Sequence, residues 1–192
     1  NLTNRYKKLK SGLAKQKKAG KSSQQGIKKA DMQCVLAGFP NVGKSTIFKT
    51  LTKLNPKISP HPFTTYKPQL GTFKHEDAPI QIIDIPSFPG HEKSLVNSTD
   101  TLLLVVDNIE QIKEAEKHTY RTKAKIILIF NKEDILSENE KRKIEATLKS
   151  KYKKLDYIFF STKPTKDKLN KLTKKIFDTF PIIRIYTKEP KK

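Results

Sequence analysis

The apolar positions of the chain fall into short, almost continuous runs separated by longer stretches in which apolar and polar positions recur with a helical period. The apolar runs cover residues 32–37, 101–106 and 126–130, as expected for strands buried on both faces of a parallel sheet. A fourth strand is predicted over residues 157–161. The helical period predicts helices over residues 44–54, 109–118, 137–152 and 166–180.

Two further segments, 69–75 and 80–85, are predicted to form a hairpin through the turn Glu76-Asp77-Ala78-Pro79. The helix over 137–152 is expected to open with a capping box made by Ser137 and Glu140. Its successor, over 166–180, places five apolar side chains on one face: Leu169, Leu172, Ile176, Phe177 and Phe180. Strands that alternate with helices predict an α/β fold, with a mostly parallel sheet covered on both sides.

The segment that links the first strand to the first helix carries the strongest chemical signal. It reads Gly38-Phe39-Pro40-Asn41-Val42-Gly43-Lys44-Ser45-Thr46, which fits the phosphate-binding pattern G-x-x-x-x-G-K-[ST]. Glycines let the backbone approach a phosphate closely, and the positive end of the helix dipole faces the same anion. Lys44 is predicted to reach the β- and γ-phosphates and Ser45 to ligate Mg²⁺. A plain glycine turn before a helix is the alternative.

Ligands of such sheets bind outside the carboxyl ends of the strands, and polar residues stand there in this sequence. Asp84, followed by Ile85-Pro86-Ser87, is placed to hold the Mg²⁺ shell. In the proline-rich segment 55–67, Thr64 and Thr65 offer a hydroxyl to Mg²⁺ and a backbone N–H to the γ-phosphate. We therefore predict a metal site formed by Ser45, Thr65 and Asp84.

The residues that follow two further predicted strands indicate which nucleotide base the protein binds. Asn131-Lys132-Glu133-Asp134 follows the strand at 126–130, and the Asp134 carboxylate can accept from N1–H and the 2-amino group of guanine. Adenine offers no such pair of donors, so the motif favours GTP and disfavours an ATPase. Ser161-Thr162-Lys163 supplies a backbone N–H for guanine O6. Taken in this order, the motifs predict a P-loop NTPase three-layer α/β/α G domain.

The residues quoted above resemble those of a known family. GFPNVGKSTIFKTLT, HPFTTYKPQLGTF and DIP are similar to the Obg-type GTPases, and most to the developmentally regulated GTP-binding protein (DRG) family. The resemblance implies GTP/GDP and Mg²⁺ as ligands, Thr65 as the Mg²⁺ ligand of switch I, and a DRG-type regulatory protein partner. Residues 180–190 resemble the passage into the family's C-terminal TGS domain, and the basic N-terminal segment resembles its helical region.

The sequence departs from that family at three places. Ser87 stands where the motif D-x-P-G has glycine, and the glycine-rich continuation of switch II is replaced by Phe88-Pro89-Gly90-His91. Only 46 residues separate Asp84 from Asn131, too few for the domain that DRG proteins insert there. The sequence to Lys192 is too short to include the family's TGS domain, so the chain is expected either to lack it or to be a fragment. Hydrolysis is therefore less firmly predicted than binding, and a GTP-binding adaptor with little or no turnover stays open.

Catalysis is assigned to Lys44, Thr65 and Asn41. Phe88 occupies the position at which many GTPases place a water-orienting glutamine, and it cannot orient water. Asn41 is at the position that holds K⁺ in cation-dependent GTPases, where the ion supplies the positive charge of an arginine finger. The alternative is that the Asn41 side chain caps the backbone of its own loop. His91 either approaches the γ-phosphate or is a solvated loop residue.

The net charge of the chain indicates which kind of partner it binds. The chain of 192 residues has a formal net charge of +21, from 40 basic and 19 acidic residues, which favours RNA or the ribosome. Only four basic residues are arginine, so a lysine-rich genome composition is the competing explanation. No apolar run approaches the roughly 18 residues of a membrane span, and one cysteine with four scattered histidines predicts no metal cluster. A cytoplasmic monomer is expected.

These observations predict three regions. Residues 1–30 contain ten basic and no acidic residues, with an amphipathic helix predicted over 2–18 and a linker over 20–26. That helix either docks on the main domain or lies on RNA. Residues 31–180 form the GTP-binding domain. Residues 181–192 begin a TGS-like strand or tail.

Overall fold

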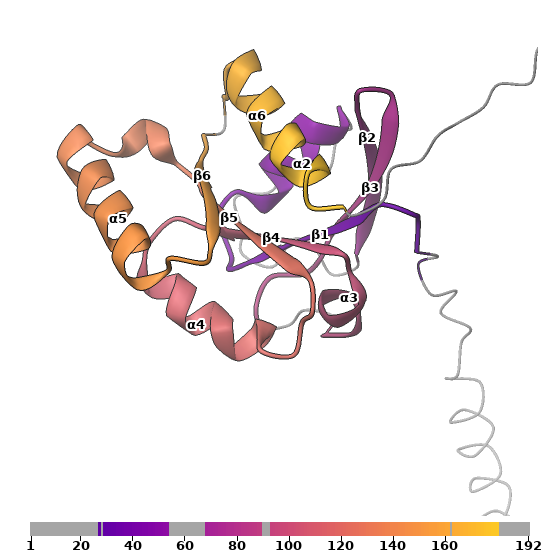
Figure 1. Ribbon diagram of the computed structural model, residues 1–192, viewed down its shortest axis with the longest axis horizontal. Helices are drawn as coiled ribbons and strands as arrows, with labels where there is room; N and C mark the ends of the chain where they lie inside the picture. The colour runs from indigo at the N-terminus through magenta and orange to yellow at the C-terminus, as the bar shows by residue number, and fades with distance from the viewer. Residues whose placement is uncertain (1–26, 28, 54–67, 90–92, 162, 181–192) are drawn as a thin grey trace, which may run out of the picture.

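The computed structural model shows a central sheet between two layers of helices (Figure 1). It describes residues 27, 29–53, 68–89, 93–161 and 163–180. Within them the strands are β1 (Gln33–Gly38), β2 (Gln69–His75), β3 (Ala78–Asp84), β4 (Thr101–Val106), β5 (Lys125–Phe130) and β6 (Asp156–Phe159). The helices are α2 (Lys44–Thr52), α3 (Lys93–Ser98), α4 (Glu110–Thr119), α5 (Glu138–Lys151) and α6 (Lys166–Phe177), with a short 3₁₀ helix η1 (Glu133–Ile135).

The six strands follow the order β2-β3-β1-β4-β5-β6. Every pair is parallel except β2 with β3, which form an antiparallel hairpin at one edge. The fully buried strands β1 and β4 lie in the middle. The mostly parallel α/β/α architecture predicted from the sequence is confirmed. All five parallel strands end at the same edge of the sheet, where β1 leads directly into the segment before α2.

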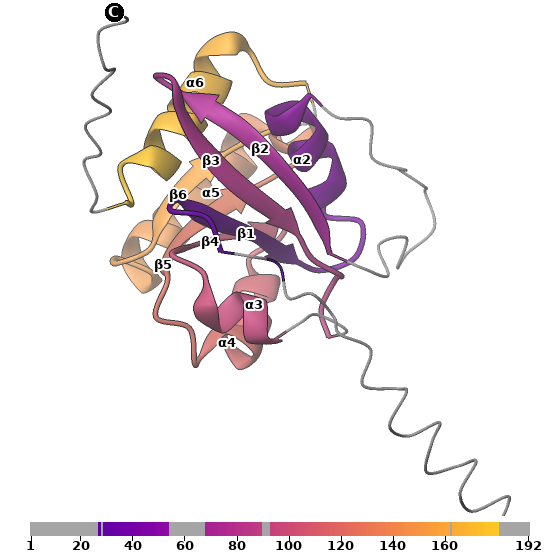
Figure 2. The ribbon, with the colours of Figure 1, turned by 90° about the vertical axis from the view of Figure 1, so that its right-hand side faces the viewer.

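Each face of the sheet has its own layer of helices (Figure 2). Helices α2 and α6 cover one face, where Phe48 and Ile176 join a core cluster with alternate residues of the strands. Helices α3, α4 and α5 cover the other, where Val96, Ile112 and Leu148 pack against the remaining strand residues. The predicted apolar face of α6 is confirmed, because its five side chains all belong to or pack on the first cluster.

Several element ends differ from the sequence prediction. The hairpin turn is only Glu76-Asp77, both with positive φ, because Ala78 and Pro79 already pair with β2. Helix α2 ends at Thr52 with Lys53 as a left-handed cap, and α6 ends at Phe177, not at residues 54 and 180. Strand β6 stops at Phe159, so Ser161 lies in the following loop. The capping box of α5 is confirmed.

Helix α3 was not predicted. Its six residues bury one side chain, Val96, so the sequence carries almost no helical period there. No helix within the described ranges is long and apolar enough to cross a membrane. The predicted helix over residues 2–18, and the tail from residue 181 onward, lie outside the described residues.

Candidate nucleotide-binding site

Residues 38–43 leave β1 at the carboxyl edge of the sheet and turn sharply into α2. Gly43 is the N-cap of α2 with φ 91°, and a Cβ atom there would lie 2.2 Å from Asn131 Nδ2. Gly38 has φ 153°, and a Cβ atom there would lie 2.3 Å from the Val105 carbonyl oxygen. Both glycines are therefore required by space as well as by backbone conformation. The N-terminus of α2, which has no acidic residue in its first turn, opens onto this loop.

Lys44 folds back along the loop that precedes it. Its side chain is buried, and Nζ donates to the carbonyl oxygens of Gly38 at 3.4 Å and Phe39 at 3.1 Å. A third bond, 2.6 Å long, goes to the Ser87 hydroxyl. Burial lowers the pKa of Lys44 to about 8, although the nearby carboxylate of Asp84 raises it. An ammonium group held in this way is poised for an anion such as phosphate.

Ser45 and Asp84 form a pair of oxygen donors beside Lys44. The Ser45 hydroxyl donates to Asp84 Oδ2 at 3.1 Å, while Asp84 Oδ1 is buried without a hydrogen-bond partner. Burial raises the pKa of Asp84 to about 6, against the lowering effects of Lys44 and Ser45. A hydroxyl and a buried carboxylate suit Mg²⁺, which prefers oxygen ligands and keeps several waters. The described residues hold no cluster of three or more His, Cys, Asp and Glu side chains.

Asn131, which follows the end of β5, forms a hydrogen bond with the P-loop. It is 1% exposed, and its Nδ2 donates to the Val42 carbonyl oxygen at 2.7 Å, whereas its Oδ1 is buried without a partner. The sequence predicted Asn131 at the base-recognition end of the site. Its contact with the P-loop was not predicted, because the residues are 89 positions apart and no spacing rule links them.

Asp134, predicted to recognise the base, is exposed on η1, three residues after Asn131. Two neighbouring side chains hold this turn in place. Lys132 pairs with Asp107 at the end of β4, with a distance of 2.6 Å from Nζ to Oδ2. Glu133 accepts from Lys141 of α5 and Lys168 of α6. Its backbone N–H also donates to the Phe160 carbonyl oxygen at 2.9 Å, so the ends of β5 and β6 are joined here.

Three rings pack together at the P-loop, one from the loop itself and two from neighbouring segments. Phe88, which is 1% exposed, stacks on His118 of α4 with centroids 4.6 Å apart, and Phe39 meets the edge of Phe88 at 5.4 Å. Phe88 therefore acts as a core residue of this end of the sheet, in agreement with the prediction that it does not orient water. Asn41 is exposed with φ 61°, and its side chain makes no hydrogen bond with described residues. The capping alternative for Asn41 is thus not supported.

The carboxyl edge of the sheet brings together most of the predicted residues. The contacts given above join the segment Gly38–Thr46 to Asp84, Ser87 and Asn131. After β6, Ser161 is buried and Lys163 is exposed. Thr64, Thr65, His91 and Thr162 lie outside the described residues, so their roles stay predictions. Asp107 was missed, although its place after an apolar strand is the signal that found Asp84.

This fold and this cluster of residues define a P-loop domain of the guanine-nucleotide type. The family described as "50S ribosome-binding GTPase" matches residues 33–132, and the chain belongs to that family. GTPase Obg of Persephonella marina is 32% identical over 170 residues, which cover 76% of this chain and 49% of that protein. The GTP-binding protein 10 homolog of Drosophila melanogaster is 35% identical over 109 residues, covering 51% and 28%. The predicted Obg-type resemblance is confirmed.

Solved structures agree on the fold. Era, in a complex with MgGDPNP and nucleotides 1506–1542 of 16S ribosomal RNA, superposes with a TM-score of 0.69 at 22% identity, covering 82% of this chain and 59% of that one. Identity at this level speaks for the fold alone. The chain spans no more than half the length of the curated relatives it matches. The placement within the DRG branch stays a prediction.

Proposed function

We propose that the protein is a guanine-nucleotide-binding switch that hydrolyses GTP slowly with Mg²⁺ and acts on the ribosome. The observation that carries the proposal is the cluster of buried Lys44 and Asp84 with half-buried Ser45 at a glycine-bounded loop, which Asn131 contacts from the segment that leads to Asp134. Bound Mg²⁺ would supply positive charge against the phosphates as the β–γ bond breaks. The family description of a 50S ribosome-binding GTPase supports the choice of partner.

The side chains of the site divide the work between phosphate and base. Lys44 would exchange its three neutral acceptors for phosphate oxygens, which carry more charge and bind an ammonium more strongly. Ser45 and Asp84 would hold Mg²⁺, with Thr65 as the third ligand implied by the family resemblance. The Asp134 carboxylate would accept from the guanine edge, and the loop at Ser161–Lys163 would meet guanine O6.

Turnover needs positive charge at the cleaved phosphate beyond that of Lys44, of the kind that an arginine finger supplies. None of the chain's four arginines lies in the P-loop or in either switch segment. Asn41 is exposed at the rim of the loop, with its side chain unbonded among the described residues. We propose that Asn41 helps to hold K⁺ against the phosphates. The dehydrated ion would stabilise the charge that develops as GTP is cleaved.

A second candidate function is a GTP-binding ribosome adaptor with little or no hydrolysis. Ser87 favours it, because this residue replaces the family's glycine and binds Lys44 through its hydroxyl at 2.6 Å. A peptide next to serine flips less freely than one next to glycine.

The rate of GTP hydrolysis in Na⁺ and in K⁺, measured at matched ionic strength, distinguishes the GTPase from the adaptor. We expect hydrolysis in Na⁺ to be slow and to rise several-fold in K⁺, with Asn41→Ala abolishing the difference. Asn97→Ala, an exposed asparagine on α3 outside the P-loop, serves as the matched control and should keep the K⁺ effect. Equal rates in both salts would refute the role of K⁺. No turnover in either salt, with GTP still bound, would favour the adaptor.

A further inference from the structure

Two neighbouring hollows lie on the side of the domain away from the nucleotide site. The larger, about 890 Å³, is lined by the last turn of α2, the end of β2 and the middle of α6. The smaller, about 460 Å³, is lined by α6 together with the starts of β5 and β6. Helices α2 and α6 run back from the carboxyl edge of the sheet. Both hollows therefore open toward its amino edge, opposite Lys44 and Asp134.

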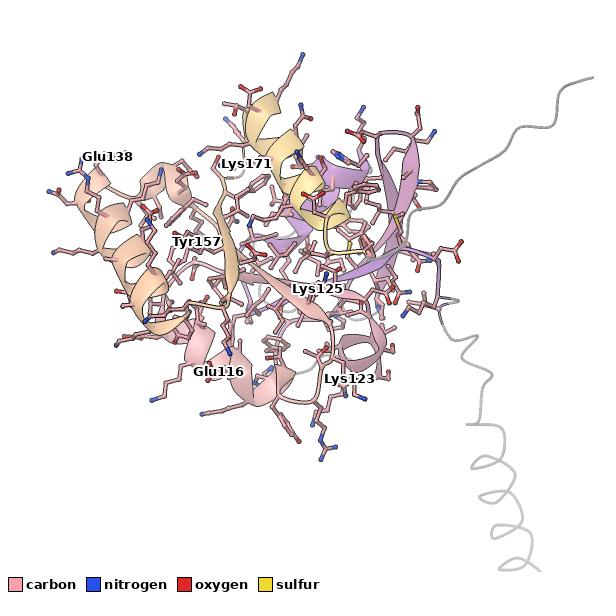
Figure 3. All side chains as sticks on the ribbon, viewed as in Figure 1. Glu116, Lys123, Lys125, Glu138, Tyr157 and Lys171 are labelled. Atoms are coloured by element: carbon pink, nitrogen blue, oxygen red, sulfur yellow. The ribbon has the colours of Figure 1, made fainter. Side chains whose placement is uncertain are left out.

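Lysines outnumber the acidic residues around both hollows, whose linings also contain Glu76, Asp156 and Asp178. Lys171 and Lys174 of α6 belong to both linings. Lys53 and Lys74 also line the larger hollow, and Lys125 also lines the smaller one. Figure 3 labels Lys171 on α6 and Lys125 at the start of β5. All five are exposed, and none forms an ion pair with another described residue. Unpaired, solvated ammonium groups gathered in this way attract an extended polyanion.

Helices α4 and α5 do not show the same excess of basic over acidic residues, although three lysines also line a separate hollow at the end of α5. The residues of α4 include three acidic side chains and two lysines, and those of α5 include three acidic and five basic side chains. Helix α6 has five lysines and only one acidic residue, Asp167. A lysine-rich composition alone would spread basic side chains evenly over these helices. Helix α6 therefore has the largest net positive charge of the three helices, which favours an anionic partner on this surface.

The residue types around the hollows favour nucleic acid over an acidic protein. Lysine is depleted in protein–protein interfaces, where arginine, tyrosine and tryptophan are enriched. None of those three residue types is among the side chains that line the two hollows. Lysine and threonine are common phosphate ligands, and exposed Thr72 lies between the lysines of the larger hollow.

We propose that this lysine groove, formed by Lys53, Lys74, Lys125, Lys171 and Lys174, binds the phosphate backbone of RNA without reading its sequence. RNA would then cover α6 while the opposite edge of the sheet holds the nucleotide. The proposal adds a second contact surface to the proposed ribosome association, on which it rests. It is separate from the basic segment 1–30.

Binding of a fluorescently labelled 20-base-pair RNA to the full chain, measured by anisotropy between 50 and 200 mM KCl, tests the groove. The double variant Lys171→Gln/Lys174→Gln should lower the slope of log K against log salt by about two and weaken binding on the order of tenfold at 0.1 M salt. Lys113→Gln/Lys117→Gln removes the same charge from exposed positions of α4 and should change both far less. Glutamine keeps the helix propensity of lysine.

Equal losses in the two double variants would overturn the groove, because they would assign the effect to net charge. Absence of RNA binding by the wild-type chain would also overturn it. If polyglutamate binds as tightly as RNA and is lost in the same variant, the surface recognises acidic polypeptide and the proposal is wrong. GTP binding is measured on the same samples. Its absence in the wild type would contradict the proposed function without deciding the groove.

Discussion

At the scale of single residues, the site depends on charged side chains that burial makes costly. Lys44 and Asp84 are buried side by side, and burial shifts the pKa of each toward its neutral form. Neither charge is fully compensated by the protein, since Lys44 bonds only to neutral oxygens and Asp84 Oδ1 has no hydrogen-bond partner. Phosphate and a divalent cation would compensate both together, so we expect the nucleotide and Mg²⁺ to strengthen each other's binding.

The hydrogen bond between Ser87 and Lys44 predicts how a substitution of Ser87 changes nucleotide affinity. Its hydroxyl accepts from Lys44 Nζ at 2.6 Å, and that bond competes with phosphate. Ser87→Ala removes the acceptor, so affinity for fluorescent GDP should rise by roughly fivefold, the equivalent of about 1 kcal/mol for one hydrogen bond. Ser94→Ala, at an exposed position of α3, is the control and should leave the affinity unchanged.

Ser87→Gly separates the hydroxyl from the backbone. Both variants lack the hydroxyl, but only glycine restores free movement of the peptide. Faster hydrolysis in Ser87→Gly than in Ser87→Ala would show that serine restrains switch II. Unchanged nucleotide affinity in both variants would mean that the Lys44–Ser87 bond does not oppose binding.

At the scale of elements, η1 depends on the two helices beside it. Glu133 is the point of attachment, because it accepts from Lys141 of α5 and Lys168 of α6 while its backbone N–H bonds to Phe160. The Glu133 side chain is only 10% exposed. Asp134 follows directly, so helices on opposite faces of the sheet hold the backbone turn of the residue that we propose recognises the base.

The pKa of Glu133 predicts how this attachment responds to pH. Burial raises the pKa of its carboxyl, but the hydrogen bonds and charges of Lys141 and Lys168 outweigh burial and hold the pKa below its usual value of 4.5. The stabilisation is therefore present above pH 4.5 and is lost as pH falls through the lowered pKa. Glu133→Gln should lower the free energy of unfolding on the order of 1 kcal/mol at pH 7, and by progressively less as pH falls below 4.5.

Denaturant unfolding at several pH values measures this difference. Glu145→Gln is the control, because Glu145 pairs with exposed Lys149 and accepts one hydrogen bond from Tyr157 but is itself 38% exposed, and it should affect stability less. A loss in Glu133→Gln that is the same at pH 3 and pH 7 would contradict an electrostatic role. It would indicate packing alone.

At the scale of the whole molecule, hydrophobic pattern alone predicted the α/β/α layers and the parallel core, because continuous apolar runs must be buried on both faces. The P-loop and the strand-end position of Asp84 followed from spacing and chemistry. The hydrogen bond from Asn131 to Val42 could not be predicted, since it joins two loops that only the folded sheet brings together. The burial of Phe88 against His118 likewise depends on tertiary packing.

Local rules also failed where tertiary contacts decided the ends of elements. Ala78 and Pro79 read as turn residues, yet their pairing with β2 extends the hairpin and leaves a two-residue turn. Helix α3 forms around one buried valine, Val96, and has no sequence pattern of its own. These differences lie at the margins of the fold, whereas the strands that position the site were predicted correctly within one or two residues.

The central claim is that this edge of the sheet binds GTP through Lys44 and selects guanine through Asp134. Equilibrium titration with fluorescent GTP, ATP and XTP in Mg²⁺ tests it most directly, on the wild type and on Asp134→Asn. We predict that the wild type prefers GTP to ATP on the order of a thousandfold or more, because a carboxylate left unpaired by the wrong base is costly. In Asp134→Asn the preference should move to XTP. Equal binding of GTP and ATP, or an unchanged preference for GTP over XTP in the variant, would contradict the account.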